Sequence, residues 1–247
     1  MADWNDPRST GQGFGVSPSL NGAVAARPTV DAGLRRHMLS IYNYMASGVL
    51  LSGVVALLMF TTGTAQAMFF SPLRWLVALS PIAIVFAMSY GAGRMQTGTL
   101  RALFWAFAVL MGMSLSTIFL VYTGPSIAAT FFATAGAFAG LSLFGYTTRR
   151  ELSGFGTFLI MGVVGLLIAS VINAFLHSPG LYYAVGFLGV LIFAGLTAYN
   201  TQQLKRQYYA VPREFAGKAV VLGALSLYLD FINMFMFLLR FMGSSRN

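Results

Sequence analysis

The last apolar stretch of the chain, residues 218–243, contains a carboxylate, an amide and a hydroxyl at helical spacing. An advance of about 100° per residue places Ser226, Asp230 and Asn233 on one face of a helix. A carboxylate at mid-membrane depth costs roughly 3 kcal/mol unless it faces the interior of a helix bundle or water. We therefore expect the function of the protein to depend on this polar face, with Asp230 at its centre.

Asp230 is the only acidic residue in a strongly apolar segment, because the other five acids lie in polar tails or turns. Two interpretations remain open. The acid can be hydrogen-bonded inside the bundle and serve packing specificity, or it can titrate and line a cation path. A neutral acid attracts no cation, whereas a carboxylate offers the oxygen ligands that Ca²⁺ prefers. One carboxylate is a small ligand set, so we expect only weak contact between Asp230 and a hard metal cation, and no cofactor.

The composition is that of an integral membrane protein. The residues are 57% hydrophobic and only 9% charged, whereas soluble domains have about a quarter charged. There is no cysteine, which excludes disulfides and thiolate sites. The net charge of +9 is spread over single or paired basic residues between apolar runs, which is typical of a topology signal. We therefore expect the lipid bilayer, and not nucleic acid, as a partner.

No sequence motif points to catalysis. There is no nucleophile–base pair, no Gly-rich phosphate loop and no His-Glu metal motif, and His37 and His177 do not have metal-ligand spacing. We therefore expect that the protein is not an enzyme.

The chain divides into a tail and a membrane domain. Residues 1–33 lack apolar periodicity and are predicted to be a disordered cytoplasmic tail, without the pattern of a cleavable signal peptide. Residues 34–247 are predicted to form an all-α domain of seven transmembrane helices. The breaks between them contain turn residues such as Gly124-Pro125 and Pro179-Gly180. The expected spans are 41–63, 73–93, 102–123, 126–146, 155–176, 181–202 and 219–243.

Basic residues predict the orientation. They precede the first span and occupy every second connection, whereas the alternate connections contain only Arg74. By the positive-inside rule the N-terminus is cytoplasmic, and seven crossings place the C-terminus outside. Asp230 weakens the insertion of the last segment, so a re-entrant hairpin is the alternative. We favour a continuous helix, because it satisfies its own backbone hydrogen bonds.

Two stretches resemble the Bax inhibitor-1 family of multi-pass membrane proteins: residues 112–152 (GMSLSTIFLVYTGPSIAATFFATAGAFAGLSLFGYTTRREL) and residues 225–233 (LSLYLDFIN). The similarity extends from about residue 34 onward. The short C-terminus lacks the charged tail of eukaryotic members, so the chain looks like a bacterial one, in the cytoplasmic membrane. The resemblance implies a fold in which the C-terminal helix is central and bracketed by the other six.

The resemblance also implies a pH-sensitive calcium leak controlled by two aspartates, on the sixth and seventh helices. Asp230 matches the second of these. At the first position this chain has Asn200, where the family usually has aspartate. Two close carboxylates share a proton because both cannot ionise easily, whereas an amide supplies a hydrogen bond but no like charge. Asn200 can therefore pair with Asp230, or simply join two helices.

Arg94 is a further candidate, because the family is associated with an arginine–aspartate latch. The alternative for Arg94 is an arginine that extends to the lipid headgroups.

Two functions thus follow from the sequence. The first is a pH-modulated, calcium-permeable leak that depends on Asp230 and Asn200. The competing hypothesis is a regulator that binds a membrane-bound ATP-dependent (AAA) protease, as the resemblance to bacterial relatives implies, with the N-terminal tail as the contact.

Overall fold

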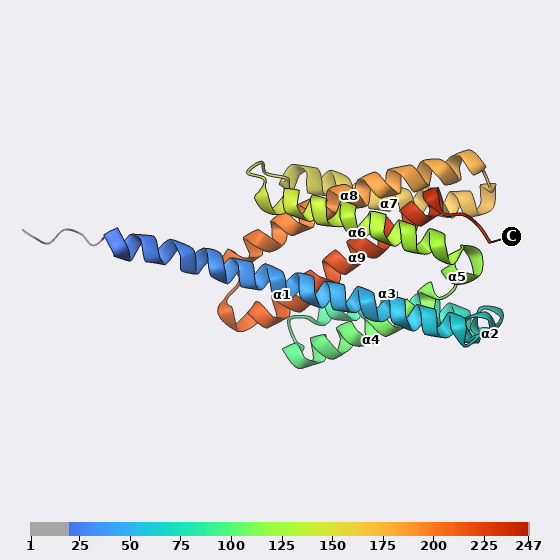
Figure 1. The fold of residues 1–247 in the computed structure, drawn as a ribbon, viewed down its shortest axis with the longest axis horizontal. Coiled ribbons are helices and arrows are strands. Elements are labelled where there is room, and N and C mark those ends of the chain that lie inside the picture. The colour runs from blue at the N-terminus through green and yellow to red at the C-terminus, as the bar shows by residue number, and fades with distance from the viewer. Residues whose placement is uncertain (1–19, 247) are drawn as a thin grey trace, which may run out of the picture. The chain divides into compact units, whose positions relative to one another are not determined.

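A computed structural model describes residues 20–246, with side chains from residue 32 onward. Residues 1–36 and 37–247 form two units, and the description below concerns the second. Of the tail predicted for residues 1–33, residues 1–19 lie outside the described residues, and residues 20–33 lie in α1, which begins at Leu20. The helices in Figure 1 are α1 (Leu20–Thr61), α2 (Thr64–Phe70), α3 (Leu73–Gly91), α4 (Thr97–Leu115), α5 (Ile118–Val121), α6 (Gly124–Thr147), α7 (Ser153–Leu176), α8 (Pro179–Ala210), the 3₁₀ helix η1 (Arg213–Phe215) and α9 (Ala216–Met242).

The prediction of seven membrane-spanning helices is confirmed. The described residues contain seven helical segments that are long and apolar enough to cross a bilayer. Two of the connections are as short as the sequence suggested, because Pro125 and Pro179 each occupy the first turn of a new helix. The spans are Ala32–Thr61, Leu73–Gly91, Thr97–Val121, Gly124–Thr147, Ser153–Leu176, Pro179–Ala210 and Arg213–Met242.

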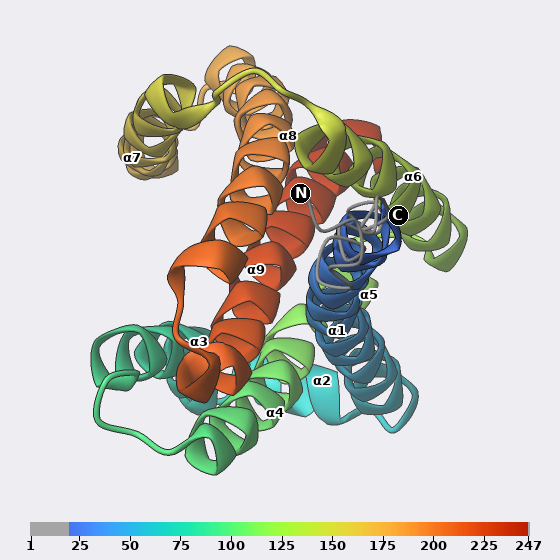
Figure 2. The same cartoon turned by 90° about the vertical axis from the view of Figure 1, so that its left-hand side faces the viewer.

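The C-terminal helix α9 lies at the centre of the bundle, as expected. In its most apolar window 61% of the residues are buried, against 39% for α8 and 11% for α7. It packs against α4, α6 and α8, and Figure 2 shows it running between the surrounding helices. Its 27 residues form one continuous helix without the break that a re-entrant hairpin needs. At 1.5 Å per residue it is about 40 Å long, which is enough to cross a hydrocarbon core of about 30 Å.

Two glycines allow neighbouring helices to approach at backbone distance. A Cβ atom on Gly112 of α4 would lie 2.6 Å from the carbonyl oxygen of Ser52 in α1. A Cβ atom on Gly145 of α6 would meet the backbone of Ala198 in α8. Lipid supplies no hydrophobic driving force between helices, so such close contacts are a main source of their association.

Charged connections gather at one end of the bundle. The α3–α4, α6–α7 and α8–α9 connections lie toward the left of Figure 1, and α2, α5 and the α7–α8 connection lie toward the right. The left-hand connections contain Arg94, Arg149, Arg150 and Arg213. By the positive-inside rule this end is predicted to face the cytoplasm, and we refer to it as the basic end.

Candidate functional site

Asn200 and Asp230 are in direct contact. The side-chain nitrogen Nδ2 of Asn200, in α8, donates a hydrogen bond of 2.7 Å to Oδ2 of Asp230, in α9. Asp230 is buried, with 4% of its surface exposed, whereas Asn200 is partly exposed. The structure thus brings together the two residues that the sequence comparison with the family placed in one pair.

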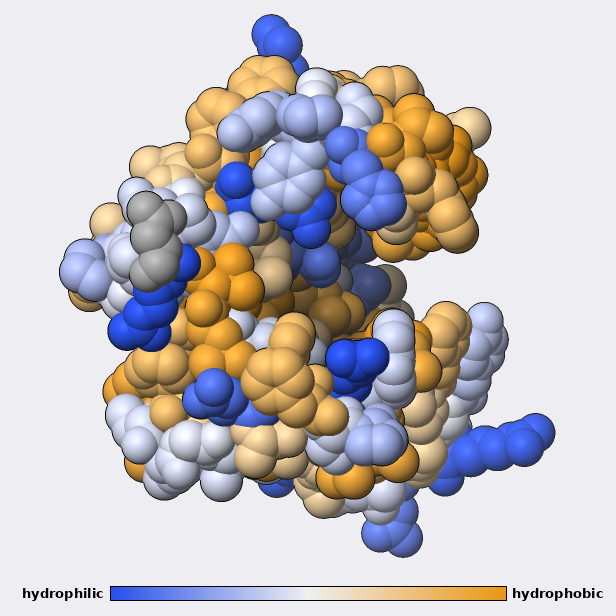
Figure 3. Space-filling model, turned by 90° about the vertical axis from the view of Figure 1, so that its right-hand side faces the viewer, coloured by the Kyte–Doolittle hydropathy of each residue, from blue (hydrophilic) through white to orange (hydrophobic). Residues whose placement is uncertain are grey.

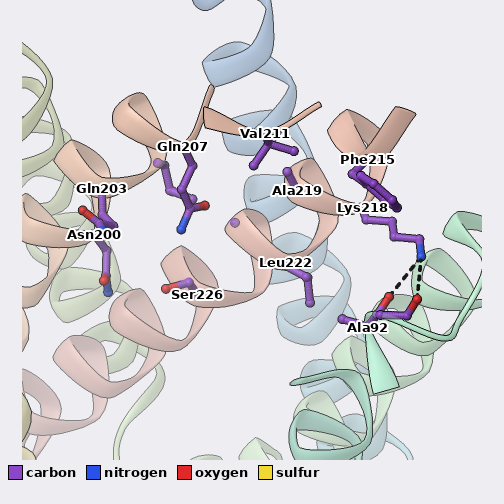
Figure 4. A pocket seen from close by; sticks show the side chains of 13 residues that line it. Ala92, Asn200, Gln203, Gln207, Val211, Phe215, Lys218, Ala219, Leu222 and Ser226 are labelled. Atoms are coloured by element: carbon purple, nitrogen blue, oxygen red, sulfur yellow. Dashed lines mark hydrogen bonds between the residues drawn. The ribbon is translucent and has the colours of Figure 1, made fainter. Parts of the chain in front are cut away.

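A cavity of about 390 Å³ extends from the basic end to this pair. Its outer part lies between the α3–α4 and α8–α9 connections, and its inner part is lined by Asn200 and Ser226 (Figure 4). Because Asn200 both lines the cavity and bonds Asp230, it links the cavity to the buried acid. The amide nitrogen is directed to the carboxylate, which leaves the amide oxygen as an acceptor.

Two glutamines on the cavity wall extend the polar surface of α8. Asn200, Gln203 and Gln207 are separated by three and four residues, so they share one helix face. This spacing was readable in the sequence, but sequence analysis identified only Asn200, and it did so from the family resemblance. The cavity therefore has amide groups along the length of one wall.

Lys218 closes part of the cavity mouth. Its Nζ donates hydrogen bonds to the carbonyl oxygens of Ala92 (3.1 Å) and Gly93 (3.5 Å), at the end of α3 (Figure 4). The ammonium group also lies 5.5 Å from the ring centroid of Phe215. From the sequence, Lys218 counted only as a topology charge, because its partners are about 125 residues away along the chain.

The other two predicted site residues lie apart from the Asn200–Asp230 contact. Asn233 donates a 2.7 Å hydrogen bond to the carbonyl oxygen of Leu229 in its own helix. Arg94 is exposed in the α3–α4 connection, next to the cavity mouth. The ion pair found among the described residues joins Arg206 to Glu151, so a latch between Arg94 and Asp230 remains a prediction.

The described residues contain no cluster of three or more His, Cys, Asp or Glu side chains that could hold a metal ion. The side-chain oxygens that line the cavity are the amide oxygens of α8 and the hydroxyl of Ser226, and the Asp230 carboxylate lies behind Asn200. Such a set suits a hard cation in brief contact better than a resident metal.

A second polar contact lies on the opposite face of α9. The hydroxyl oxygens of Tyr228 and Ser52 are 2.6 Å apart, and Ser52 also donates to the carbonyl oxygen of Ala108 at 2.6 Å. Both side chains are fully buried. The Tyr228 ring packs edge-on against Phe107, with 5.0 Å between ring centroids. Sequence reasoning missed this contact, because an isolated serine and tyrosine in apolar runs carry no pattern.

The comparisons with known proteins agree on one family. A family profile described as "Inhibitor of apoptosis-promoting Bax1" matches residues 34–247. A protein from Caulobacter vibrioides is 46% identical over 236 residues, which is 91% of this chain and 94% of the relative. The inner membrane protein YbhL of Escherichia coli K12 is 41% identical over 220 residues, 87% of this chain and 94% of the relative. A protein from Rickettsia prowazekii is 45% identical over 230 residues, 89% of this chain and 94% of the relative.

Proposed function

The chain belongs to the Bax inhibitor-1 family of membrane proteins, and we propose that it is a pH-modulated leak for calcium ions in a bacterial cytoplasmic membrane. The observation that carries this proposal is the hydrogen bond between Asn200 and Asp230 at the inner end of a cavity with one amide-lined wall. A buried acid that communicates with a cavity through a single side chain is suited to control entry of a cation.

In the proposed mechanism the ion enters the cavity at the basic end. It exchanges water for the amide oxygen of Asn200 and the hydroxyl of Ser226, and it is attracted by the carboxylate of Asp230. When Asp230 is protonated, that attraction is lost. Calcium flux should therefore fall as the pH is lowered and rise as the acid ionises.

In the proposed mechanism, apolar side chains close the path beyond Asp230. A buried cluster lies at the last turns of α9 and consists of Ile118, Ile127, Phe235 and Leu239. An ion that passes Asp230 requires these side chains to separate and admit water. In this proposal the structure corresponds to the closed state of the leak, with the cavity on one side of the apolar barrier.

Calcium flux into proteoliposomes tests this proposal. Asp230→Asn removes the titratable charge and keeps the size of the side chain, so we expect flux at pH 8 to fall at least about tenfold and its pH dependence to disappear. Tyr228→Phe is the matched control, because Tyr228 is buried in the same helix but faces away from the cavity. Equal flux and an equal pH profile for wild type and Asp230→Asn would sink the proposal.

The cytoplasmic location of the basic end has its own test. The chain has no cysteine, so a single cysteine at Thr148 or at Ser178 gives an unambiguous label at one end. We expect a membrane-impermeant maleimide added to intact cells to label Ser178→Cys and not Thr148→Cys. The opposite pattern would reverse the direction of the proposed leak.

The competing hypothesis, a regulator of a membrane-bound protease, depends on residues 2–30. Their side chains lie outside the described part of the chain, and no feature of residues 32–246 favours this hypothesis. Deletion of residues 2–30 separates the two functions, because the leak should retain its flux. Loss of flux on deletion would count against the proposed mechanism.

A further inference from the structure

A second cavity lies at the end of the bundle opposite the basic end. It has a volume of about 560 Å³ and is formed where α7 ends, α8 begins and α9 ends. Its polar side chains include Asn173, His177, Tyr183 and Arg240. Figure 3 views this end of the molecule and shows a hollow in which hydrophilic residues lie between hydrophobic surfaces.

Arg240 contributes the cationic group of this cavity. Its guanidinium carbon lies 5.2 Å from the ring centroid of Tyr182 and 5.5 Å from that of Phe237. The two rings hold the side chain in place by cation–π contact. Aromatic faces accept no strong hydrogen bond from a guanidinium, so its N–H donors remain available.

Among residues 37–246, Arg240 differs from the other partly buried basic side chains, which are Lys205, Arg206 and Lys218. Each of those three donates to protein acceptors at 2.8–3.2 Å: the carbonyl oxygens of Tyr146 and Ala92, the hydroxyl of Ser153 and the carboxylate of Glu151. Arg240 has ring contacts but no hydrogen bond or ion pair with the described residues. Its N–H donors are therefore free to bind an acceptor that enters the cavity from outside the chain.

The described residues provide no counter-charge at this end. Their acidic side chains are Glu151 and Glu214, in connections at the basic end, and Asp230, which is paired with Asn200. Tyr122, at the α5–α6 turn, does not act as an anion either. Burial, and to a smaller extent a hydrogen bond with Tyr182, raises the pKa of Tyr122 to about 12. The cavity therefore has net positive charge at neutral pH.

Asn173 adds a neutral donor. Its Oδ1 accepts a 3.0 Å hydrogen bond from the backbone nitrogen of Ser178, which fixes the orientation of the amide. Its Nδ2 is then left as a donor, and no partner for it is found among the described residues.

The position of Arg240 in the last turn of α9 also favours a cation, through the helix dipole. Among the described residues, however, no hydrogen bond joins its guanidinium group to a carbonyl oxygen at that helix end.

We propose that this cavity binds a phosphate group, with Arg240 as its principal ligand and Asn173 as a second donor. A guanidinium presents a planar fork of donors that matches the oxygens of a phosphate. The cavity volume lies within the roughly 300–1,000 Å³ of small-molecule sites. The ends of three spans place it at the depth of lipid headgroups, and the neighbouring Phe175 of α7 is 81% exposed, as a lipid-facing side chain would be. The phosphate can thus come from a lipid headgroup or from solution.

The test measures ligand-induced thermal stabilisation of the purified, delipidated full-length chain in detergent. Three probes are compared: inorganic phosphate, dihexanoyl phosphatidylglycerol, and dihexanoylglycerol, which has the same acyl chains without phosphate. We expect one or both phosphate probes to raise the melting temperature, and dihexanoylglycerol to leave it unchanged. A response to phosphatidylglycerol alone assigns the site to lipid, and a response to both shows that free phosphate is sufficient.

Two variants and one control locate the effect. Arg240→Gln should weaken apparent phosphate affinity by about tenfold or more. Asn173→Asp keeps the acceptor for Ser178 but replaces the free donor with a negative charge, so it should abolish binding even if Arg240→Gln fails to fold. Arg74→Gln is the control, because Arg74 is an exposed arginine at the same end that lies over an aromatic ring, Trp75. An unresponsive wild type, or an equal loss in Arg74→Gln, overturns the proposal.

Discussion

The two faces of α9 each carry a buried polar side chain, but these two side chains have different partners. Tyr228 and Asp230 are two residues apart and are 0% and 4% exposed, so their burial is almost equal. Tyr228 meets Ser52 in a region packed by Phe104 and Phe107. Asp230 meets Asn200, which also lines a cavity.

This comparison shows that two polar groups of almost equal burial can have very different surroundings. Around Tyr228, neutral hydroxyls are paired with each other and with a carbonyl oxygen, and the Phe104 and Phe107 rings pack edge-on against the Tyr228 ring. Around Asp230, the group can change charge, and its partner borders space that an ion or water can occupy. We therefore expect substitutions on the Tyr228 face to affect stability and substitutions on the Asp230 face to affect flux.

The largest stability loss is expected at Gly112, on the Tyr228 face. A side chain there collides with the backbone of Ser52, which cannot move aside. We expect Gly112→Val to reduce the free energy of unfolding by about 3 kcal/mol, measured by denaturant titration in mixed micelles. Gly98→Val in the same helix is the control, because a Cβ atom at Gly98 has no neighbour within 4 Å. Equal losses would show that the close α1–α4 approach is not required.

Removal of Ser52 is expected to cost somewhat less. Ser52→Ala leaves the Tyr228 hydroxyl buried without its partner, so the free energy of unfolding should fall by about 2 kcal/mol. Adding Tyr228→Phe should recover part of this loss, because both partners are then apolar. A double-mutant cycle measures the coupling, and calcium flux should stay unchanged throughout. A large drop in flux for Ser52→Ala would contradict the division between the two faces.

On the Asp230 face, Asn200→Asp should change the pH response. Two adjacent carboxylates share a proton, and more base is needed to ionise both. We expect the pH of half-maximal calcium flux to move upward by about one unit, equivalent to about 1.4 kcal/mol. Asn200→Leu removes the hydrogen bond without adding charge and serves as the comparison. An unchanged midpoint in Asn200→Asp would show that the pair does not sense pH.

The smallest effect is expected at Asn233. Its amide donates to Leu229 in the same helix, so it joins no second element. We expect Asn233→Ala to change the free energy of unfolding by less than about 0.5 kcal/mol, and flux by less than about twofold. A larger flux defect would restore Asn233 to the ion path.

The membrane spans were predictable from sequence because their signals are local. Apolar runs, with proline and glycine between them, placed all seven helices, and Asp230 identified the polar face of the last one. The central position of α9 was predicted from the family resemblance, because hydropathy alone does not show which of the seven spans is the most buried. The Ser52–Tyr228 contact and the partners of Lys218 were missed, because they join residues 176 and about 125 positions apart. Such contacts depend on how helices pack and leave no periodic pattern.

The central position of α9 has a consequence for biogenesis. Translation proceeds from the N-terminus, so the six surrounding spans leave the ribosome before the helix on which they pack has been made. Until α9 arrives, Ser52 lacks the hydroxyl of Tyr228 and Asn200 lacks the carboxylate of Asp230 within the bilayer. The translocon or a membrane insertase must therefore hold six spans whose central helix is still missing. A nascent chain stalled before residue 216 should be a preferred substrate for degradation.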